Sequence, residues 1–219
     1  MDTDLTISME PLKYDPANIQ SIVWYDKSQV KFMEVGKEQS VWFSSYLEKR
    51  CILVTSVCEH EREVNRAHRY NKSEERPKDP KILFSSSHPY LVVNQNSIEE
   101  INGRIEEEVS NKSFRANIVV EQQNGIHKLL PYEEDKWRRI CIGSEAILFN
   151  ERPCPRCVRI NIDYKREEVR KNCEPTRTLL RYRRGSHGRD KYVPTFGCNC
   201  TLIRTGTISI GDSVSVSYS

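Results

Sequence analysis

The spacing of apolar residues divides the chain into a shorter N-terminal part and a longer part rich in short strands. Apolar residues on one helical face predict a helix over 39–49, and the apolar run after it predicts a strand over 52–57. A second run, 90–93, is typical of a buried strand. Isoleucines and a valine then recur at helical spacing and predict an amphipathic helix over 97–109, which Ser97 would begin as part of a capping box.

Strand signals dominate the remainder. Regular alternation on both sides of a Gly-Asp turn signal predicts a β-hairpin over 208–218, and a short helix is predicted over 177–184. Many short strands with few helices indicate a mainly β, α+β fold, in which a barrel or sandwich core carries flanking helices. The other strand candidates are 117–121, 138–142, 146–150 and 158–163.

Residues 59–81 differ in composition from their surroundings. Thirteen of these 23 residues are charged, with both signs present, and two prolines stand near the end. A segment with so little apolar content cannot bury enough surface to fold by itself, so a solvated, flexible loop is expected.

Overall composition excludes several classes of function. The formal net charge is only +3, and no pattern of aromatic residues on which bases would stack surrounds the basic run at 181–191, so nucleic acid is not expected as a partner. No apolar run approaches the roughly 20 residues needed to cross a bilayer, and the acidic N-terminus does not resemble a signal peptide. A cytoplasmic protein without a membrane partner is therefore expected.

Eight cysteines are present, and without a secretory signal they indicate metal binding or catalysis more than disulfides. Cys154 and Cys157 stand three positions apart, among Arg152, Arg156 and Arg159. Nearby cations lower the pKa of a thiol and favour the thiolate, which is the nucleophilic and metal-binding form. This pair is the main candidate for chemistry.

A zinc site is an alternative for the same cysteines. Cys198 and Cys200 could join Cys154 and Cys157 to give four tetrahedral thiolate ligands, which would make the chain a zinc-stabilised, non-catalytic interaction domain. The Cys-x-Cys spacing of the second pair is narrower than the usual zinc spacing, which disfavours this reading.

Several blocks, taken in order, resemble the MOSC domain. This family domain occurs at the C-terminus of eukaryotic molybdenum cofactor sulfurases and in the mitochondrial amidoxime-reducing component. One block alone is a weak signal, whereas six in the family order are a strong one. The blocks are 113–120, 133–137 with 142–143, 153–157, 175–183, 196–197 and 206–212.

The resemblance implies a β-barrel related to the pyruvate-kinase barrel and a molybdopterin-type cofactor. It implies that Cys157 ligates molybdenum or carries sulfur, with Cys154 as the second candidate. An arginine fork can hold a phosphate and an asparagine amide can bind a pterin edge, which fits the family block that contains Arg115 and Asn117. The residues expected to bind the cofactor are Arg115, Asn117, Arg156, Arg177 and Arg183.

The resemblance also implies domains and a function. Residues 82–219 would form the MOSC domain, and 1–58 would be a remnant of the family's N-terminal region. Residues 42–44 and 50–51 look more like the sulfurase branch, so sulfur transfer to the molybdenum cofactor is expected, with xanthine dehydrogenase and aldehyde oxidase as clients. A sulfurase would also need an upstream pyridoxal-phosphate domain, which is not in this sequence. The alternative from the resemblance is a molybdenum-dependent reductase of N-hydroxylated compounds.

Overall fold

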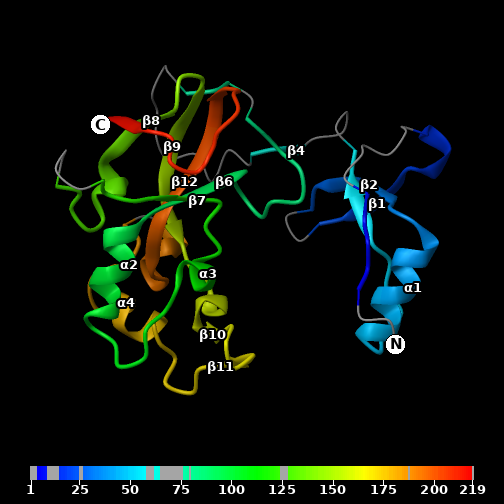
Figure 1. Ribbon diagram of the computed structural model, residues 1–219, viewed down its shortest axis with the longest axis horizontal. Coiled ribbons are helices and arrows are strands. Elements are labelled where there is room, and N and C mark those ends of the chain that lie inside the picture. Colours follow the sequence, from blue (N-terminus) through cyan, green and yellow to red (C-terminus); the bar gives the residue numbers. More distant parts are fainter. Residues whose placement is uncertain are drawn as a thin grey trace. The chain divides into compact units, whose positions relative to one another are not determined.

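A computed structural model describes residues 4–8, 15–24, 27–57, 62–64, 76–78, 80–123, 128–186 and 188–218. The chain divides into two units (Figure 1). Unit 1 comprises residues 1–63 and 81–86, and unit 2 comprises 64–80 and 87–219. Most of the predicted charged loop at 59–81, and Cys58, lie outside the described residues.

Unit 1 contains a three-stranded antiparallel sheet with one α-helix inserted between its second and third strands. The predicted helix and strand of this region are confirmed, although both are shifted or shorter at their ends. Ser40 joins the two elements, because its hydroxyl accepts a hydrogen bond from the Leu53 amide and donates one to Glu34. The elements are η1 (Pro16–Asn18), β1 (Gln20–Val23), β2 (Gln29–Glu34), α1 (Lys37–Tyr46), β3 (Val54–Ser56), β4 (Arg62–Glu63) and β5 (Lys81–Ile82).

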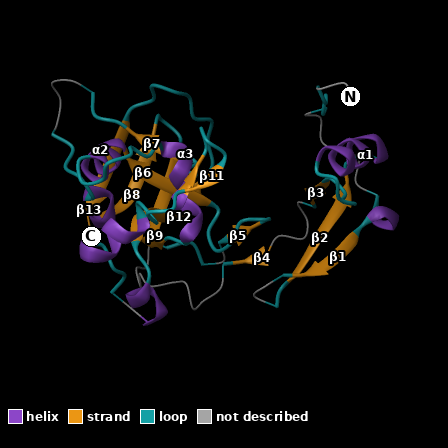
Figure 2. Ribbon diagram, turned by 90° about the horizontal axis from the view of Figure 1, so that it is seen from below, coloured by secondary structure: helices purple, strands orange, loops and turns teal. Residues whose placement is uncertain are grey.

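Unit 2 is built on a six-stranded sheet with the order β13-β8-β9-β12-β6-β7. All neighbours are antiparallel except β6 and β7, which are parallel. The sheet curls into a half-barrel, as Figure 2 shows. The strands are β6 (Tyr90–Asn94), β7 (Ile118–Val120), β8 (Trp137–Ile142), β9 (Ala146–Pro155), β12 (Thr195–Arg204) and β13 (Val214–Tyr218).

Helices and short elements of unit 2 pack around this sheet. Phe114, Leu179 and Phe196 are completely buried in one apolar cluster, and a second cluster contains Trp137 and Ile140. Both clusters include residues of the sheet, so the half-barrel has apolar side chains on two faces. The elements are α2 (Gln95–Asn102), α3 (Asn111–Phe114), η4 (Glu133–Lys136), η5 (Val158–Asn161), β10 (Ile162–Asp163), β11 (Glu168–Val169), α4 (Thr176–Tyr182) and η6 (Gly188–Tyr192).

The predicted fold class is confirmed: the chain is mainly β, with a curled barrel-like sheet and, among the described residues, four α-helices. Strands predicted at 90–93, 117–121 and 138–142 are present, and the strand predicted at 146–150 continues to Pro155. Among the described residues, no helix has both the length and the apolar character that a membrane span requires.

The predicted strand over 158–163 is wrong. Residues 158–161 form the 3-10 helix η5, in which the Ile160 amide donates to the Cys157 carbonyl over 3.3 Å. Only Ile162–Asp163 is a strand. The apolar alternation does not mark one buried face, because Val158 is exposed while Ile160 is buried.

Two other local predictions are also wrong. The hairpin over 208–218 has its turn, closed by the Asp212 amide and the Ser209 carbonyl, but β13 pairs with β8 and residues 208–210 form no strand. The capping box at Ser97 does not form. Asn94 is the N-cap of α2, and the Ser97 hydroxyl instead donates to the buried carboxylate of Glu134.

Candidate functional site

Cys157 occupies the position between the end of β9 and the start of η5, where it is the N-cap residue. Its side chain is exposed, and Arg159 donates from Nε to its Sγ over 3.4 Å. Partial burial by itself would raise the pKa of this thiol. The hydrogen bonds and charge of Arg159, together with the charge of Arg156, lower the pKa by more than this, so the net shift is downward. The thiol is therefore both accessible and biased toward the thiolate.

Cys154 differs from Cys157 in its surroundings. It lies on β9, it is buried, and it belongs to the apolar cluster that contains Phe114 and Phe196. Its sulfur accepts a hydrogen bond from Nη1 of Arg156 over 3.2 Å. Of the two thiols, Cys157 is thus the one that an external metal or group can approach from solvent.

Arg156 connects the cysteine segment to the segment around Phe114. Besides contacting Cys154, it donates from Nη2 to the carbonyl oxygen of Phe114, and its own amide donates to the Pro194 carbonyl over 2.7 Å. Its buried Nε has no acceptor among the described residues.

Arg115 follows directly after Phe114 and is exposed. It caps the C-terminus of α3 in the left-handed conformation, with φ of 55°, and its side chain forms no ion pair or hydrogen bond with the described part of the chain. Phe114 stacks on Phe196 with ring centroids 3.8 Å apart, which fixes the backbone that carries Arg115. Arg115 is thus an exposed arginine next in sequence to the residue whose carbonyl Arg156 binds.

Asn117 is partly committed to structure. Its Oδ1 accepts a hydrogen bond from the backbone amide of Leu91 over 2.8 Å, and its backbone amide donates one to the Leu91 carbonyl over 3.0 Å. These bonds hold the start of β7 beside β6. The side-chain NH2 group has no acceptor among the described residues, so Asn117 can donate to a ligand but its oxygen is already used.

Two other predicted residues are held by protein carboxylates. Arg183 binds Asp135 through two hydrogen bonds of 2.6 and 3.1 Å, and its guanidinium lies 4.1 Å from the ring centroid of Tyr132. Arg177 is exposed and pairs with Glu174 over 2.8 Å. Arg183 therefore has a structural partner, and Arg177 is the more accessible of the two.

The structure adds residues that sequence reasoning did not select. Arg159 was recognised only as a flanking charge, whereas it is the direct hydrogen-bond partner of Cys157. Asn161 is buried, and its Oδ1 accepts from the amide and hydroxyl of Thr176, which ties η5 to the start of α4. No sequence signal marks this link, because it joins residues 15 positions apart through a side chain.

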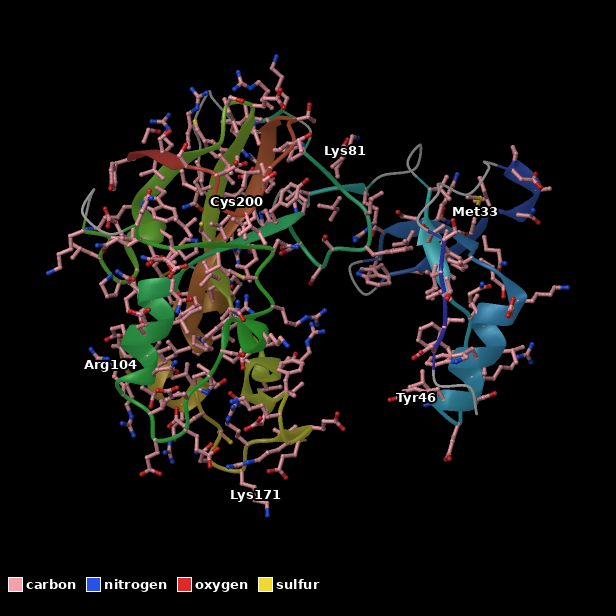
Figure 3. All side chains as sticks on the ribbon, viewed as in Figure 1. Met33, Tyr46, Lys81, Arg104, Lys171 and Cys200 are labelled. Carbon is pink, nitrogen blue, oxygen red and sulfur yellow. The ribbon has the colours of Figure 1, made fainter. Side chains whose placement is uncertain are left out.

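The four-cysteine zinc site is not formed. Cys198 and Cys200 are fully buried on β12, with their sulfur atoms 3.6 Å apart, whereas Cys157 is exposed after the end of β9. Figure 3 shows Cys200 among the strands of unit 2. Within the described ranges, no three His, Cys, Asp or Glu side chains gather closely enough to bind a metal ion.

Comparison with known proteins places most of unit 2 in one domain family. The model of the MOSC domain matches residues 79–215. The mouse mitochondrial amidoxime-reducing component 1 is 30% identical over 192 residues, covering 85% of this chain and 52% of the mouse protein. The zebrafish protein of the same name is 28% identical and covers 94% of this chain and 61% of its own length.

A third relative is the molybdenum cofactor sulfurase of Oryza sativa subsp. japonica, which is 29% identical over 157 residues. That match covers 66% of this chain but 18% of the rice protein. The chain spans little more than half the length of the amidoxime-reducing relatives that it matches.

Proposed function

Because the chain belongs to the MOSC domain family, we propose that unit 2 binds a molybdenum cofactor with Cys157 as the thiolate ligand. The observation that supports this proposal most directly is the exposed Cys157 thiol, whose pKa is lowered by Arg159 and Arg156. A thiolate is a soft ligand of the kind that molybdenum in a pterin cofactor can accept. The bound cofactor would supply a metal that exchanges electrons with a substrate.

The arginines around Cys157 fit the anionic part of such a cofactor. Arg115 offers a guanidinium without a protein partner, and Arg156 offers a buried Nε without an acceptor, both counted within the described residues. A guanidinium binds phosphate through two parallel hydrogen bonds. Asn117 would donate its side-chain NH2 group to the pterin edge, since its oxygen is bound to Leu91. Arg177 is a further candidate for binding the cofactor, although it pairs with Glu174. Arg183 is bound to Asp135 and would influence the cofactor only through that carboxylate.

In this proposal, residues 82–219 form the cofactor-binding domain and 1–58 correspond to the end of the family's N-terminal region. Cys154 has a supporting role: it is buried and accepts a hydrogen bond from Arg156, so it helps to hold the arginine whose charge acts on Cys157. Cys157 contacts the cofactor directly.

The first of two specific functions within this proposal is that of a reductase of N-hydroxylated compounds. It is favoured because the relatives named amidoxime-reducing component align over 85% of this chain or more, whereas the sulfurase aligns over 66%. Their longer matches extend beyond the MOSC region into unit 1. In this role, Cys157 stays bound to the metal, while Arg159 stabilises the sulfur as an anion.

The second reading is sulfur transfer to the cofactor, as the sequence pattern at 42–44 predicts. It is supported by the sulfurase relative and by the exposure of Cys157, which a sulfur donor could reach. In this role the domain would act with a pyridoxal-phosphate domain and would serve clients such as xanthine dehydrogenase and aldehyde oxidase.

The cofactor proposal is tested by measuring molybdenum by mass spectrometry and oxidised pterin by fluorescence in the same purified sample. We expect equal molar amounts, which Cys157→Ser and Arg115→Gln should reduce. Cys173→Ser and Arg181→Gln are matched controls, because both residues are exposed and neither is part of the site. Pterin-free protein after expression in a cofactor-producing host would contradict the proposal.

The two readings are then separated with the loaded protein. Reduction of benzamidoxime with electron-transfer partners supplied, lost in Cys157→Ser, supports the reductase. Sulfuration of cofactor in a client enzyme, with no benzamidoxime reduction, supports sulfur transfer.

A further inference from the structure

The two edge strands of the half-barrel sheet line the same groove. β13 and β7 are the first and last strands in the sheet order, yet both line a groove of about 830 Å³. Because the sheet curls, its two edges approach a common opening instead of pointing in opposite directions. We call this opening the seam groove; it is lined by residues 117–123, Leu129, Trp137, Ile142, 208–214, Val216 and Tyr218.

Backbone groups of β13 point into the opening. The Gly143 amide donates to the Ser213 carbonyl over 2.9 Å, and antiparallel strands alternate between residues that bond to the neighbour and residues that do not. Val214 and Val216 therefore direct their N–H and C=O groups away from β8. No backbone hydrogen bond between described residues connects β13 or β7 to a strand across the seam.

An exposed sheet edge of this composition is a site for strand pairing. Proteins usually protect edge strands with charged residues, prolines or bulges, because an open edge can pair with another chain. β7 is Ile118-Val119-Val120, and β13 alternates valine and serine without any charged residue. The valines that point backbone groups outward also line the groove with their side chains.

Trp137 gives a second, independent indication of a ligand. It lines the seam groove with only 2% of its surface exposed, and its indole N–H has no acceptor among the described residues. A buried donor without a partner costs free energy, so an acceptor from outside would stabilise it. A carbonyl oxygen of an added strand is such an acceptor.

The charges at the groove identify the chemistry of the occupant. Among the described residues that line it, the charged ones are both acidic: Glu121, directly after β7, and Asp212, shortly before β13. The pairing pattern makes β7 and β13 run in the same direction, so the two carboxylates stand near opposite ends of the groove. A partner with basic residues at both ends of an apolar segment is complementary to them.

We propose that the seam groove binds an extended peptide segment, supplied by another polypeptide, that pairs as a strand with Val214 and Val216 of β13. Its alternate side chains are apolar, and Lys or Arg residues flank it. About five residues suffice, because β13 itself has five residues and a strand rises about 3.4 Å per residue. Strand addition of this kind takes its affinity from main-chain bonds and its specificity from alternate side chains.

The test uses the ¹⁵N-labelled chain and a blocked synthetic peptide, Lys-Lys-Val-Thr-Val-Thr-Val-Thr-Lys-Lys, titrated by NMR. We expect the Trp137 indole signal to shift and the Val214 and Val216 amides to exchange more slowly with solvent. Among the three tryptophan indole signals, that of Trp137 is identified with Trp137→Phe, which keeps an aromatic ring but removes the indole N–H donor. We expect this variant to bind at least threefold more weakly, whereas Trp42→Phe in unit 1 should bind normally.

Two control peptides separate strand pairing from general stickiness. Glutamates in place of the lysines should weaken binding about tenfold, because they would face Glu121 and Asp212. N-methylation of the three valines removes backbone donors and should also weaken binding about tenfold. Glu121→Lys should weaken binding of the lysine peptide about fivefold, and Glu106→Lys, the same charge change at an exposed position away from the groove, should not.

Each other outcome overturns the proposal. Equal binding of the N-methylated peptide would show that the groove accepts an apolar molecule without strand pairing. Concentration-dependent self-association that protects the same amides would make a second copy of the chain the occupant. Absence of any shift at Trp137 at millimolar peptide would exclude the groove as a peptide site.

Discussion

The Nε of Arg159 donates a hydrogen bond to the Sγ of Cys157 across 3.4 Å, and both residues belong to the turn that begins η5. Cys157 is the N-cap residue of η5 and Arg159 lies within it, so the 3-10 helix found where a strand was predicted over 158–163 carries the guanidinium that contacts the thiol. This contact contributes to the electrostatic environment that lowers the pKa of Cys157.

The first prediction concerns this pair. Replacing Arg159 by Gln should raise the pKa of Cys157, because a hydrogen bond and a positive charge that stabilise the thiolate are removed. Alkylation of Cys157 by iodoacetamide should then be slower at pH 7, and its pH profile should move to higher pH. Peptide mass spectrometry measures the rate at Cys157 alone. Arg181→Gln is the matched control, and an unchanged profile in Arg159→Gln would remove the assigned role of Arg159.

A second prediction concerns the partly buried ion pair between Arg183 and Asp135. The two hydrogen bonds of 2.6 and 3.1 Å join side chains that are 13% and 23% exposed. Asp135→Asn leaves the guanidinium buried without its counter-charge and should lower the free energy of unfolding by about 2 kcal/mol. Urea denaturation measures it. Arg166→Gln, at an exposed pair with Glu107, should leave the urea midpoint almost unchanged.

The third prediction follows from Glu134, which is fully buried and bound to the Ser97 hydroxyl. Burial raises the pKa of its carboxyl to about 7, from an ordinary value of 4.5. The folded state therefore holds this proton at pH values where the unfolded chain has lost it. Stability should fall as the pH rises from about 5 to about 7, by about 3 kcal/mol for this group alone, and should stay lower above that range.

Glu134→Gln provides the matched comparison, since glutamine keeps the shape and can still accept from Ser97. Urea unfolding of both proteins between pH 5 and pH 8 should give a flatter pH profile for the variant. Parallel profiles would mean that Glu134 is not the group responsible.

A fourth prediction concerns Gly197 in β12, which has a φ of 69°. A Cβ at this position would lie 2.7 Å from the Val92 carbonyl oxygen and 2.7 Å from a methyl group of Val93. Gly197→Ala therefore combines left-handed strain with overpacking and should cost about 3 kcal/mol of stability. Gly103→Ala should change stability much less, because Gly103 ends α2 with a φ of −66° and its Cβ would meet no atom closer than 3.4 Å. Thermal and urea unfolding compare the two variants.

Local apolar patterns located the strands at Tyr90–Asn94 and Trp137–Ile142, which bury most of their apolar side chains. They also located the helix at Lys37–Tyr46, although Val41 and Tyr46 on it are exposed and Ser40 is its buried residue. β12, by contrast, was not predicted. It lies between β9 and β6, and every residue along Thr195–Thr201 is buried. Because both faces are buried and carry small and polar residues, the segment lacks the alternation of apolar and polar positions that predicts a strand.

The 97–109 helix shows the same limit at an element's end. Its apolar residues Ile105 and Val109 do reach the core, but the helix stops at Asn102. The Asn102 side chain binds both the amide and the carbonyl of Val109, which holds a non-helical loop in place. Helical spacing alone cannot distinguish this loop from another turn of helix.

The sequence by itself determined the family, the mainly β fold class and the identity of the thiols and arginines that could serve a cofactor, because residue types and their order are local properties of the chain. Tertiary structure alone decided which of them can act. Burial made Cys154 a core residue and left Cys157 accessible, and Asp135 occupied Arg183 while Arg115 stayed without a partner among the described residues. These differences arise from long-range contacts and solvent exposure, which no pattern of neighbouring residues encodes.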